Sequence, residues 1–188
     1  MSYKTYTTNA LVCGSFANNT SDKYFLLLTE SAGMIMATAR SVREEKSKQR
    51  FALQDFSLIK VSLVQGKTGW RIGSVEASRN YYLEASTRDS RVVVTEAVRL
   101  LRRLLQGEEV DSTVFVETTT ALDIMVTKDS SIKNLIDIFT LRVLYRLGYV
   151  AHSEVVELWL NDDSYISAPP LSKAARKVID KGLNASHL

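Results

Sequence analysis

The spacing of apolar residues changes near residue 85, and this change constrains the fold more than any other feature of the sequence. Before it, short runs rich in β-branched and aromatic residues are separated by turn-forming clusters, a pattern that predicts strands. After it, apolar residues recur at the three- and four-residue spacing of one face of a helix. We therefore predict an α+β chain with a strand-rich domain over residues 1–84 and an all-α domain over residues 85–188.

Five strands are expected in the first domain, and five strands suit a small closed β-barrel. In the last of them, Trp70 and Ile72 fall on one face and Val75 on the other, so we expect a bulge near Gly73 and Ser74. A helical turn before the fourth strand would close one end of the barrel. The expected strands cover residues 6–16, 23–29, 34–39, 56–65 and 70–83, and the expected turn covers residues 51–54.

The second domain is expected to be an antiparallel helical bundle. Gly107, Gly148 and Gly182 are expected to end three of its helices, because glycine adopts the left-handed conformation of a helix end without strain. The expected helices cover residues 89–106, a segment that begins at residue 111 or 112, and residues 131–147, 153–160 and 172–181.

Positive charge is concentrated in the first domain, although the whole chain carries a formal charge of only +3. Residues 1–84 contain 11 Lys and Arg against 7 Asp and Glu, whereas residues 85–188 contain 13 against 14. The segment 40–50 alone has a net charge of +3, because only two glutamates oppose its basic side chains. These basic side chains belong to Arg40, Arg43, Lys46, Lys48 and Arg50.

Residues that usually carry catalysis or hold metals are scarce. Cys13 is the single cysteine, so one chain can form neither an internal disulfide nor a four-cysteine zinc site. His152 and His187 are the two histidines, and a capping, surface or tail position explains them without catalysis. Adjacent carboxylates recur in no matching motif, and no phosphate-binding glycine pattern occurs. We therefore expect no enzyme activity, no cofactor and no bound metal.

Binding chemistry fits the sequence better. Single-stranded nucleic acid needs cations for its phosphates and aromatic faces for its unstacked bases. The segment 40–50 supplies cations, and the strand residues Tyr24 and Trp70 can supply aromatic faces, as can Tyr81 and Tyr82. A charge run is also typical of a solvated loop, and a strand aromatic is also typical of the core, so both interpretations stay open at this point.

Several pieces of residues 10–77 occur in a distinctive order. They are Ala10–Val12, Ser21–Thr29 followed by Gly33, Ala39–Arg43, Lys46–Ser47 and Leu53–Ile59. Their order resembles the amino-terminal OB-fold domain of the bacterial recombination mediator family RecO. In the helical half, Phe139–Tyr149 is similar to the helix that ends in Leu-Gly-Tyr in the same family.

The resemblance implies a non-enzymatic repair protein of the bacterial cytoplasm, associated with the nucleoid. Such a protein binds single- and double-stranded DNA, anneals complementary strands, and works with RecR so that RecA replaces the single-stranded-DNA-binding protein. DNA contacts are then expected partly in the basic turn after the third strand, here residues 40–50. Many relatives carry a four-cysteine zinc site in the helical domain, which this chain lacks, and this chain is shorter than the usual member.

The helical half is then the expected protein-docking surface, where the family accepts the acidic tail of the single-stranded-DNA-binding protein. Arg142 and Arg146, one helical turn apart, are candidates for this contact, and an exposed, solvated helix face is the alternative for both. Two other functions stay open. The chain could be a pure protein-interaction module with a solvated basic loop. It could also bind RNA, because phosphate contacts do not distinguish RNA from DNA without a contact to the 2′-hydroxyl.

Overall fold

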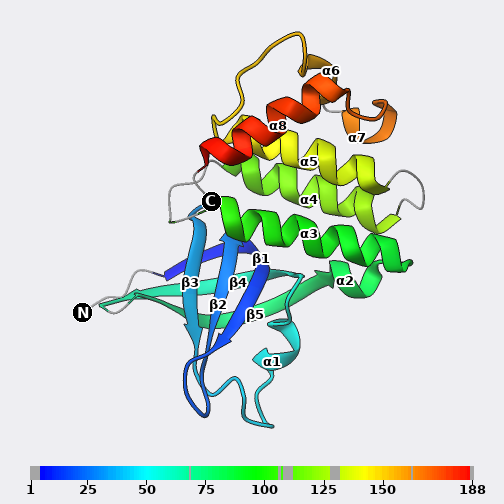
Figure 1. The fold of residues 1–188 in the computed structure, drawn as a ribbon. Helices are drawn as coiled ribbons and strands as arrows, with labels where there is room; N and C mark the ends of the chain where they lie inside the picture. Colours follow the sequence, from blue (N-terminus) through cyan, green and yellow to red (C-terminus); the bar gives the residue numbers. More distant parts are fainter. Residues whose placement is uncertain are drawn as a thin grey trace. The chain divides into compact units, whose positions relative to one another are not determined.

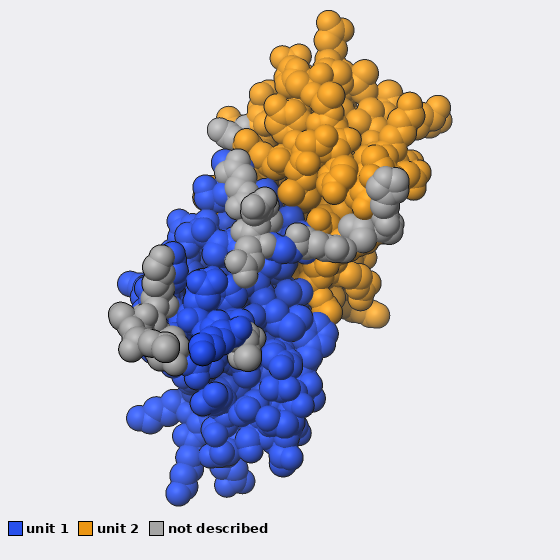
Figure 2. All heavy atoms as spheres, turned by 90° about the vertical axis from the view of Figure 1, so that its left-hand side faces the viewer, with its two compact units in different colours: residues 1–84, 105–115 blue, residues 85–104, 116–188 orange. Residues whose placement is uncertain are grey.

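The computed structural model describes residues 5–67, 69–105, 107, 112–127, 132–161 and 163–186. The chain divides into two compact units, coloured separately in Figure 2. Unit 1 comprises Met1–Glu84 and Leu105–Phe115, and unit 2 comprises Ala85–Leu104 and Val116–Leu188. Leu105–Phe115, which the sequence placed in the helical domain, thus group with the strand-rich unit. The helix predicted to reach residue 106 ends at Leu104, because the described Leu105 is not helical. The helix limits predicted at residues 111 and 131, and His187, lie outside the described residues.

Unit 1 is built around a closed barrel with the strand order β1-β2-β3-β5-β4 (Figure 1). Its neighbouring strands pair antiparallel except β3 and β5, which pair parallel. A five-stranded barrel of this order is an OB-fold, so the predicted α+β architecture is confirmed. The strands are β1 (Thr5–Ala17), β2 (Lys23–Thr29), β3 (Gly33–Ala39), β4 (Ser57–Gly66) and β5 (Gly69–Asn80).

The barrel closes because β5 bends at the predicted bulge. Val75 pairs with Val61 and Ile72 pairs with Leu63, so two residues of β5, Gly73 and Ser74, stand opposite a single residue of β4. The extra residue lets Ile72 and Trp70 face the core although their spacing from Val75 breaks the two-residue period.

The fifth strand is shorter than predicted, because it ends at Asn80 rather than at residue 83. The Asn80 side chain accepts a hydrogen bond of 3.0 Å from the backbone N–H of Leu83, and this contact starts the short helix α2 (Tyr81–Glu84). The predicted helical turn at the barrel end is present as α1 (Gln49–Ala52), two residues earlier than expected. Leu53 follows α1 directly and joins the barrel core with 5% of its surface exposed.

Unit 2 is helical, and its central helix α5 contacts α3, α6, α7 and α8. Gly148, with φ of 77°, follows the end of α5, as predicted. Gly182 does not end α8, contrary to the prediction. An added Cβ there would lie 3.0 Å from Val150 Cγ2 and 3.2 Å from Leu144 Cδ1, so Gly182 permits close packing within the helix. The helices are α3 (Arg88–Leu104), α4 (Ser112–Thr127), α5 (Ile132–Arg146), α6 (Glu157–Leu160), α7 (Ser164–Ser167) and α8 (Lys173–Ala185).

Within the described residues, none of these helices combines the length and the apolar character that crossing a bilayer requires.

Candidate nucleic-acid interface

The basic segment, residues 40–50, leaves the end of β3 and runs into α1. All five of its cationic side chains are exposed, and none lies within ion-pair distance of a carboxylate in the described part of the chain. Its one deeply buried side chain is Val42, which has 3% of its surface exposed and belongs to the barrel core. The segment therefore presents its positive charges to solvent from a fixed apolar anchor.

The turn between β1 and β2 holds the basic segment in place. The carboxylate of Asp22 accepts a hydrogen bond of 2.8 Å from the backbone N–H of Ser41, whose φ of 50° is left-handed. The backbone N–H of Arg43 donates to the carbonyl of Ser21 at 3.0 Å, and the Arg43 guanidinium donates to the carbonyl of Asn19 at 2.8 Å. Arg43 thus helps to position the loop in addition to carrying charge.

Asn19 and Asp22 form a compact turn of their own. The side-chain oxygen of Asn19 accepts hydrogen bonds from the backbone N–H groups of Ser21 and Asp22, and its amide donates to the Asp22 carboxylate at 3.0 Å. The Ser41 N–H, the Asn19 amide and the nearby Arg40 charge lower the pKa of the Asp22 carboxyl below its ordinary value. These two residues were missed from the sequence, where only the turn-forming Asn-Asn-Thr-Ser-Asp composition marked them.

The other end of the basic segment is fixed to the barrel by α1. The side-chain amide of Gln49 donates a hydrogen bond of 2.7 Å to the backbone carbonyl of Gly73, at the bulge of β5. Arg50 lies with its guanidinium 4.8 Å from the centre of the exposed Phe51 ring, close enough for a cation–π contact. The cations at both ends of the segment are thus carried by backbone that is bonded to the barrel.

The structure places the four aromatic candidates for base stacking in different environments. Trp70 is 8% exposed, belongs to the barrel core and meets the Tyr6 ring edge-on, with ring centres 5.7 Å apart. Its face is not available to a base, and the expectation for Trp70 is corrected because its strand parity points it inward. The expectation for Tyr81 is also corrected, because Tyr81 begins α2 and is fully buried. Tyr82 lies on α2 and stacks on the ring of Phe56, with ring centres 5.4 Å apart.

Tyr24, in contrast, lies on the outer face of the barrel and is only partly buried. It pairs with Phe16 on β1 and with Thr38 on β3, so these three side chains share one face. One step along the same face, Leu26 pairs with Met36. Phe16 is 41% and Met36 is 52% exposed. We call Phe16, Tyr24, Leu26 and Met36 the apolar strip. It crosses β1, β2 and β3 and includes the face of strands 2 and 3 that OB-folds use for oligonucleotides.

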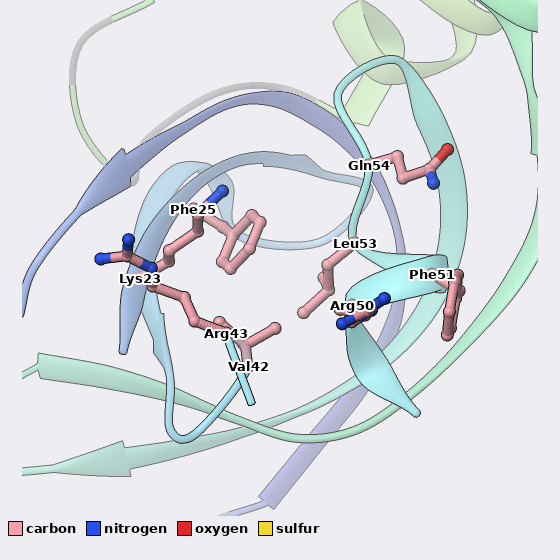
Figure 3. Close-up of a pocket in the computed structure, with 8 residues that line it drawn as sticks. All are labelled: Lys23, Phe25, Val42, Arg43, Arg50, Phe51, Leu53 and Gln54. Atoms are coloured by element: carbon pink, nitrogen blue, oxygen red, sulfur yellow. The ribbon is translucent and has the colours of Figure 1, made fainter. Parts of the chain in front are cut away.

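Two hollows open beside the basic segment. One of about 480 Å³ is lined by side chains of β2, the basic segment and α1 (Figure 3). The other, of about 340 Å³, is lined by Arg40, Gln49 and residues of β4 and β5, including Arg71. Each hollow therefore combines apolar barrel residues with cations, the pairing that a strand of unstacked nucleotides requires.

A family model described as "Recombination protein O N terminal" matches residues 1–81 of the chain. Residues 1–81 are therefore similar to the RecO amino-terminal domain. This match confirms the resemblance over the barrel and supports a role in recombination and repair. A search of curated proteins returns no match for the chain.

The matched range, residues 1–81, contains the basic segment, the apolar strip and both hollows. Residues 82–188 lie beyond the matched range, so the similarity of Phe139–Tyr149 to the family's helical domain stays a prediction. The candidate nucleic-acid interface thus lies wholly within the matched domain.

Arg142, a candidate protein-binding residue of unit 2, is buried with 5% of its surface exposed. Its guanidinium donates to both carboxylate oxygens of Glu117, at 2.6 and 2.8 Å, and to the backbone carbonyls of Leu160 and Asn161. The Tyr165 hydroxyl donates to the same carboxylate at 2.6 Å, and burial raises its pKa. The expectation that Arg142 contacts a partner is corrected, because its guanidinium is used inside unit 2.

Arg146 remains available to a partner. Its side chain is 36% exposed, and its Nε lies 3.9 Å from the Glu117 carboxylate, at the edge of ion-pair distance.

The one cysteine, Cys13, is 2% exposed in β1, and His152 is exposed with its ring 6.4 Å from that of Tyr145. In the described residues, no group of three or more His, Cys, Asp or Glu side chains is arranged to hold a metal ion.

Proposed function

We propose that this chain is a non-enzymatic recombination mediator that binds single- and double-stranded DNA and anneals complementary single strands. The observation that carries the proposal is the basic segment: five exposed cations without a carboxylate partner in the described residues, on a loop that is hydrogen-bonded to the barrel at both ends. The apolar strip on the neighbouring barrel face supplies surface for unstacked bases.

The proposed mechanism is electrostatic. Annealing brings two polyanions together, and a surface that binds phosphates screens their repulsion without reading the sequence. Contacts to phosphates form equally with single and double strands, whereas contacts to the apolar strip need unstacked bases. We therefore expect little base specificity and a preference for single strands that depends on Tyr24.

The partners follow from the family and are part of the proposal. With RecR, the chain would help RecA to displace the single-stranded-DNA-binding protein, whose acidic tail would dock on unit 2. Arg146 is the candidate cation for that tail, because its guanidinium is partly exposed whereas that of Arg142 is not.

Strand annealing tests the proposal directly. Complementary DNA oligonucleotides are annealed with the unchanged protein and with the variant Lys46→Glu/Lys48→Glu, which reverses two exposed charges that make no described side-chain contact. The matched control is Lys173→Glu/Lys177→Glu, which reverses two exposed charges on α8. We expect annealing to fall in the first variant and to persist in the control. Equal annealing by both would remove the basic segment from the mechanism.

The salt dependence of binding gives a second, quantitative test. If about four to five cations contact phosphates, the logarithm of the binding constant for single-stranded DNA should fall with the logarithm of salt concentration with a slope of about −3 to −3.5. The Lys46→Glu/Lys48→Glu variant should lose at least about 1.4 of this slope, since two phosphate contacts disappear. A slope near zero for the unchanged protein would contradict DNA binding and favour a protein-interaction module. Equal or tighter binding of RNA of the same sequence would favour an RNA-binding function.

A further inference from the structure

The larger hollow lies at the end of the barrel that α1 closes (Figure 3). Phe25, Val42 and Leu53 point into it and form its floor, and all three are at least nine-tenths buried. Lys23 and Arg43 lie on one side of this floor, and Arg50 lies on the α1 side. The hollow thus has an apolar base and cations on two opposite sides. We call it the barrel-end pocket.

Charge in the barrel-end pocket is of one sign. Its described lining includes Lys23, Arg43 and Arg50 but no Asp or Glu. Three cations without an acidic neighbour favour an anionic ligand, because the ligand then replaces water and counter-ions rather than an existing ion pair. Phosphate groups suit this arrangement, since a guanidinium presents several N–H donors in a planar fork.

The cations are held on both sides of the pocket. One guanidinium nitrogen of Arg43, Nη1, is bound to the Asn19 carbonyl at 2.8 Å, and its backbone N–H is bound to Ser21. On the opposite side, Arg50 rests on the Phe51 ring. Side chains that are already ordered lose less conformational freedom when a ligand binds. The pocket is therefore preorganised for an anionic ligand.

A free phosphate would use the cations but leave the floor of Phe25, Val42 and Leu53 unused, and a purely apolar ligand would leave the cations unused. A nucleotide unit uses both, with its phosphate on the cations and its base or sugar on the floor. The volume of about 480 Å³ falls in the range of small-ligand pockets and suits one such unit rather than several.

We propose that the barrel-end pocket takes one unstacked nucleotide of a bound DNA strand. This inference rests on the proposed DNA-binding function and adds a defined subsite at the barrel end, separate from the apolar strip on the side of the barrel. The bound nucleotide can lie at the end of a DNA strand, or at an internal position from which it is turned out of the strand.

Methyl resonances of Val42 and Leu53 report directly on the pocket floor, and DNA binding is measured separately by fluorescence anisotropy. The probes are thymidine 5′-monophosphate, inorganic phosphate, a linear oligothymidylate and a circular oligothymidylate. We expect the mononucleotide and the linear strand to shift both methyl resonances. Shifts with the circular strand as well would identify an internal nucleotide, and shifts with the linear strand alone would identify a strand end; either result supports the pocket.

Two double variants distinguish binding in the pocket from non-specific electrostatic attraction. Lys23→Met/Arg50→Met removes two pocket cations that are at least partly exposed, and Lys173→Met/Lys177→Met removes two charges from α8. We expect the first variant to weaken mononucleotide binding several-fold and the second to leave it unchanged. Unshifted backbone resonances away from the substitutions show that both variants fold.

The failures are distinguishable. If the oligonucleotides bind by anisotropy but shift neither methyl resonance, the pocket proposal is wrong and the proposed function stands. If inorganic phosphate produces the same shifts as the mononucleotide at the same concentration, the site is a simple anion site and the nucleotide assignment is wrong. If no oligonucleotide binds, the proposed function fails and the pocket proposal fails with it.

Discussion

The carboxylate of Asp22 accepts a hydrogen bond of 2.8 Å from the backbone N–H of Ser41. One residue is acidic and lies in the turn before β2, and the other is the second residue of the most basic segment of the chain. The contact stabilises the left-handed conformation of Ser41, with φ of 50°, at the point where the chain leaves β3. An acidic residue therefore determines where the cations that we assign to DNA binding are presented.

The variant Asp22→Ala separates positioning from charge. Removing a negative charge beside the basic segment should tighten DNA binding if electrostatics alone acts, whereas losing the Ser41 contact should weaken it by loosening the segment. We expect several-fold weaker binding by anisotropy. The control Glu44→Ala removes the same charge from the segment itself, where the described structure gives the carboxylate no contact, and should tighten binding slightly. Tighter binding by both variants would show that Asp22 acts only through its charge.

The Asp22 contact should also depend on pH. The pKa of this carboxyl is lowered from 3.8, first by the Ser41 N–H, then by the Asn19 amide, and also by the Arg40 charge. A carboxyl with a depressed pKa in the folded state contributes stability above its unfolded pKa and loses it as pH falls through the folded value. We expect the amide resonance of Ser41 to be constant at neutral pH and to titrate with a midpoint below 3.8. A midpoint at or above that value would contradict the contact.

Substitutions of Trp70 and of Tyr24 should have opposite effects: the first should mainly lower stability, and the second should mainly lower affinity for single-stranded DNA. Trp70 lies in the barrel core, so Trp70→Ala should destabilise unit 1 by about 3–5 kcal/mol in denaturant unfolding. Tyr24 is only partly buried, so Tyr24→Ala should cost less stability but reduce single-strand affinity by about 1–3 kcal/mol if a base stacks there. The conservative variant Trp70→Phe should bind DNA normally. A selective loss of affinity in Trp70→Phe would return Trp70 to the interface.

Features that depend on neighbouring residues could be predicted from the sequence. The strand pattern, the bulge at Gly73 and the exposure of the basic segment follow from period and charge, which neighbouring residues determine. The inward orientation of the Trp70 side chain could also be predicted, because Trp70 shares its strand face with Ile72. The roles of Asp22 and Glu117 could not be predicted from the sequence. Each depends on a hydrogen-bond partner about 20 or more residues away, which only folding brings close.

Arg142 illustrates the same limit in unit 2. Its position three residues after the buried Phe139 places it within the apolar stripe of α5, which is compatible with burial. Only the structure supplies the Glu117 carboxylate and the backbone carbonyls that make a buried guanidinium stable there. The sequence alone therefore left it as an exposed candidate.

The buried Glu117–Arg142 pair should be far more important for stability than the Arg146 contact to the same carboxylate. Arg142→Met leaves a buried carboxylate without its main partner and should cost about 3–5 kcal/mol of unfolding free energy. Arg146→Met removes a partly exposed contact of 3.9 Å and should cost at most about 1 kcal/mol.

A double variant tests whether the buried charge, rather than lost packing, causes that destabilisation. Glu117→Leu/Arg142→Met removes both charges and should be more stable than Arg142→Met alone, because no uncompensated buried charge remains. Denaturant unfolding of the four proteins, the unchanged chain included, measures the differences. If the double variant is less stable than Arg142→Met, the hydrogen bond from Tyr165 to the Glu117 carboxylate contributes more stability than the unpaired buried charge costs. In that case the carboxylate acts mainly as an acceptor that joins α4 and α7.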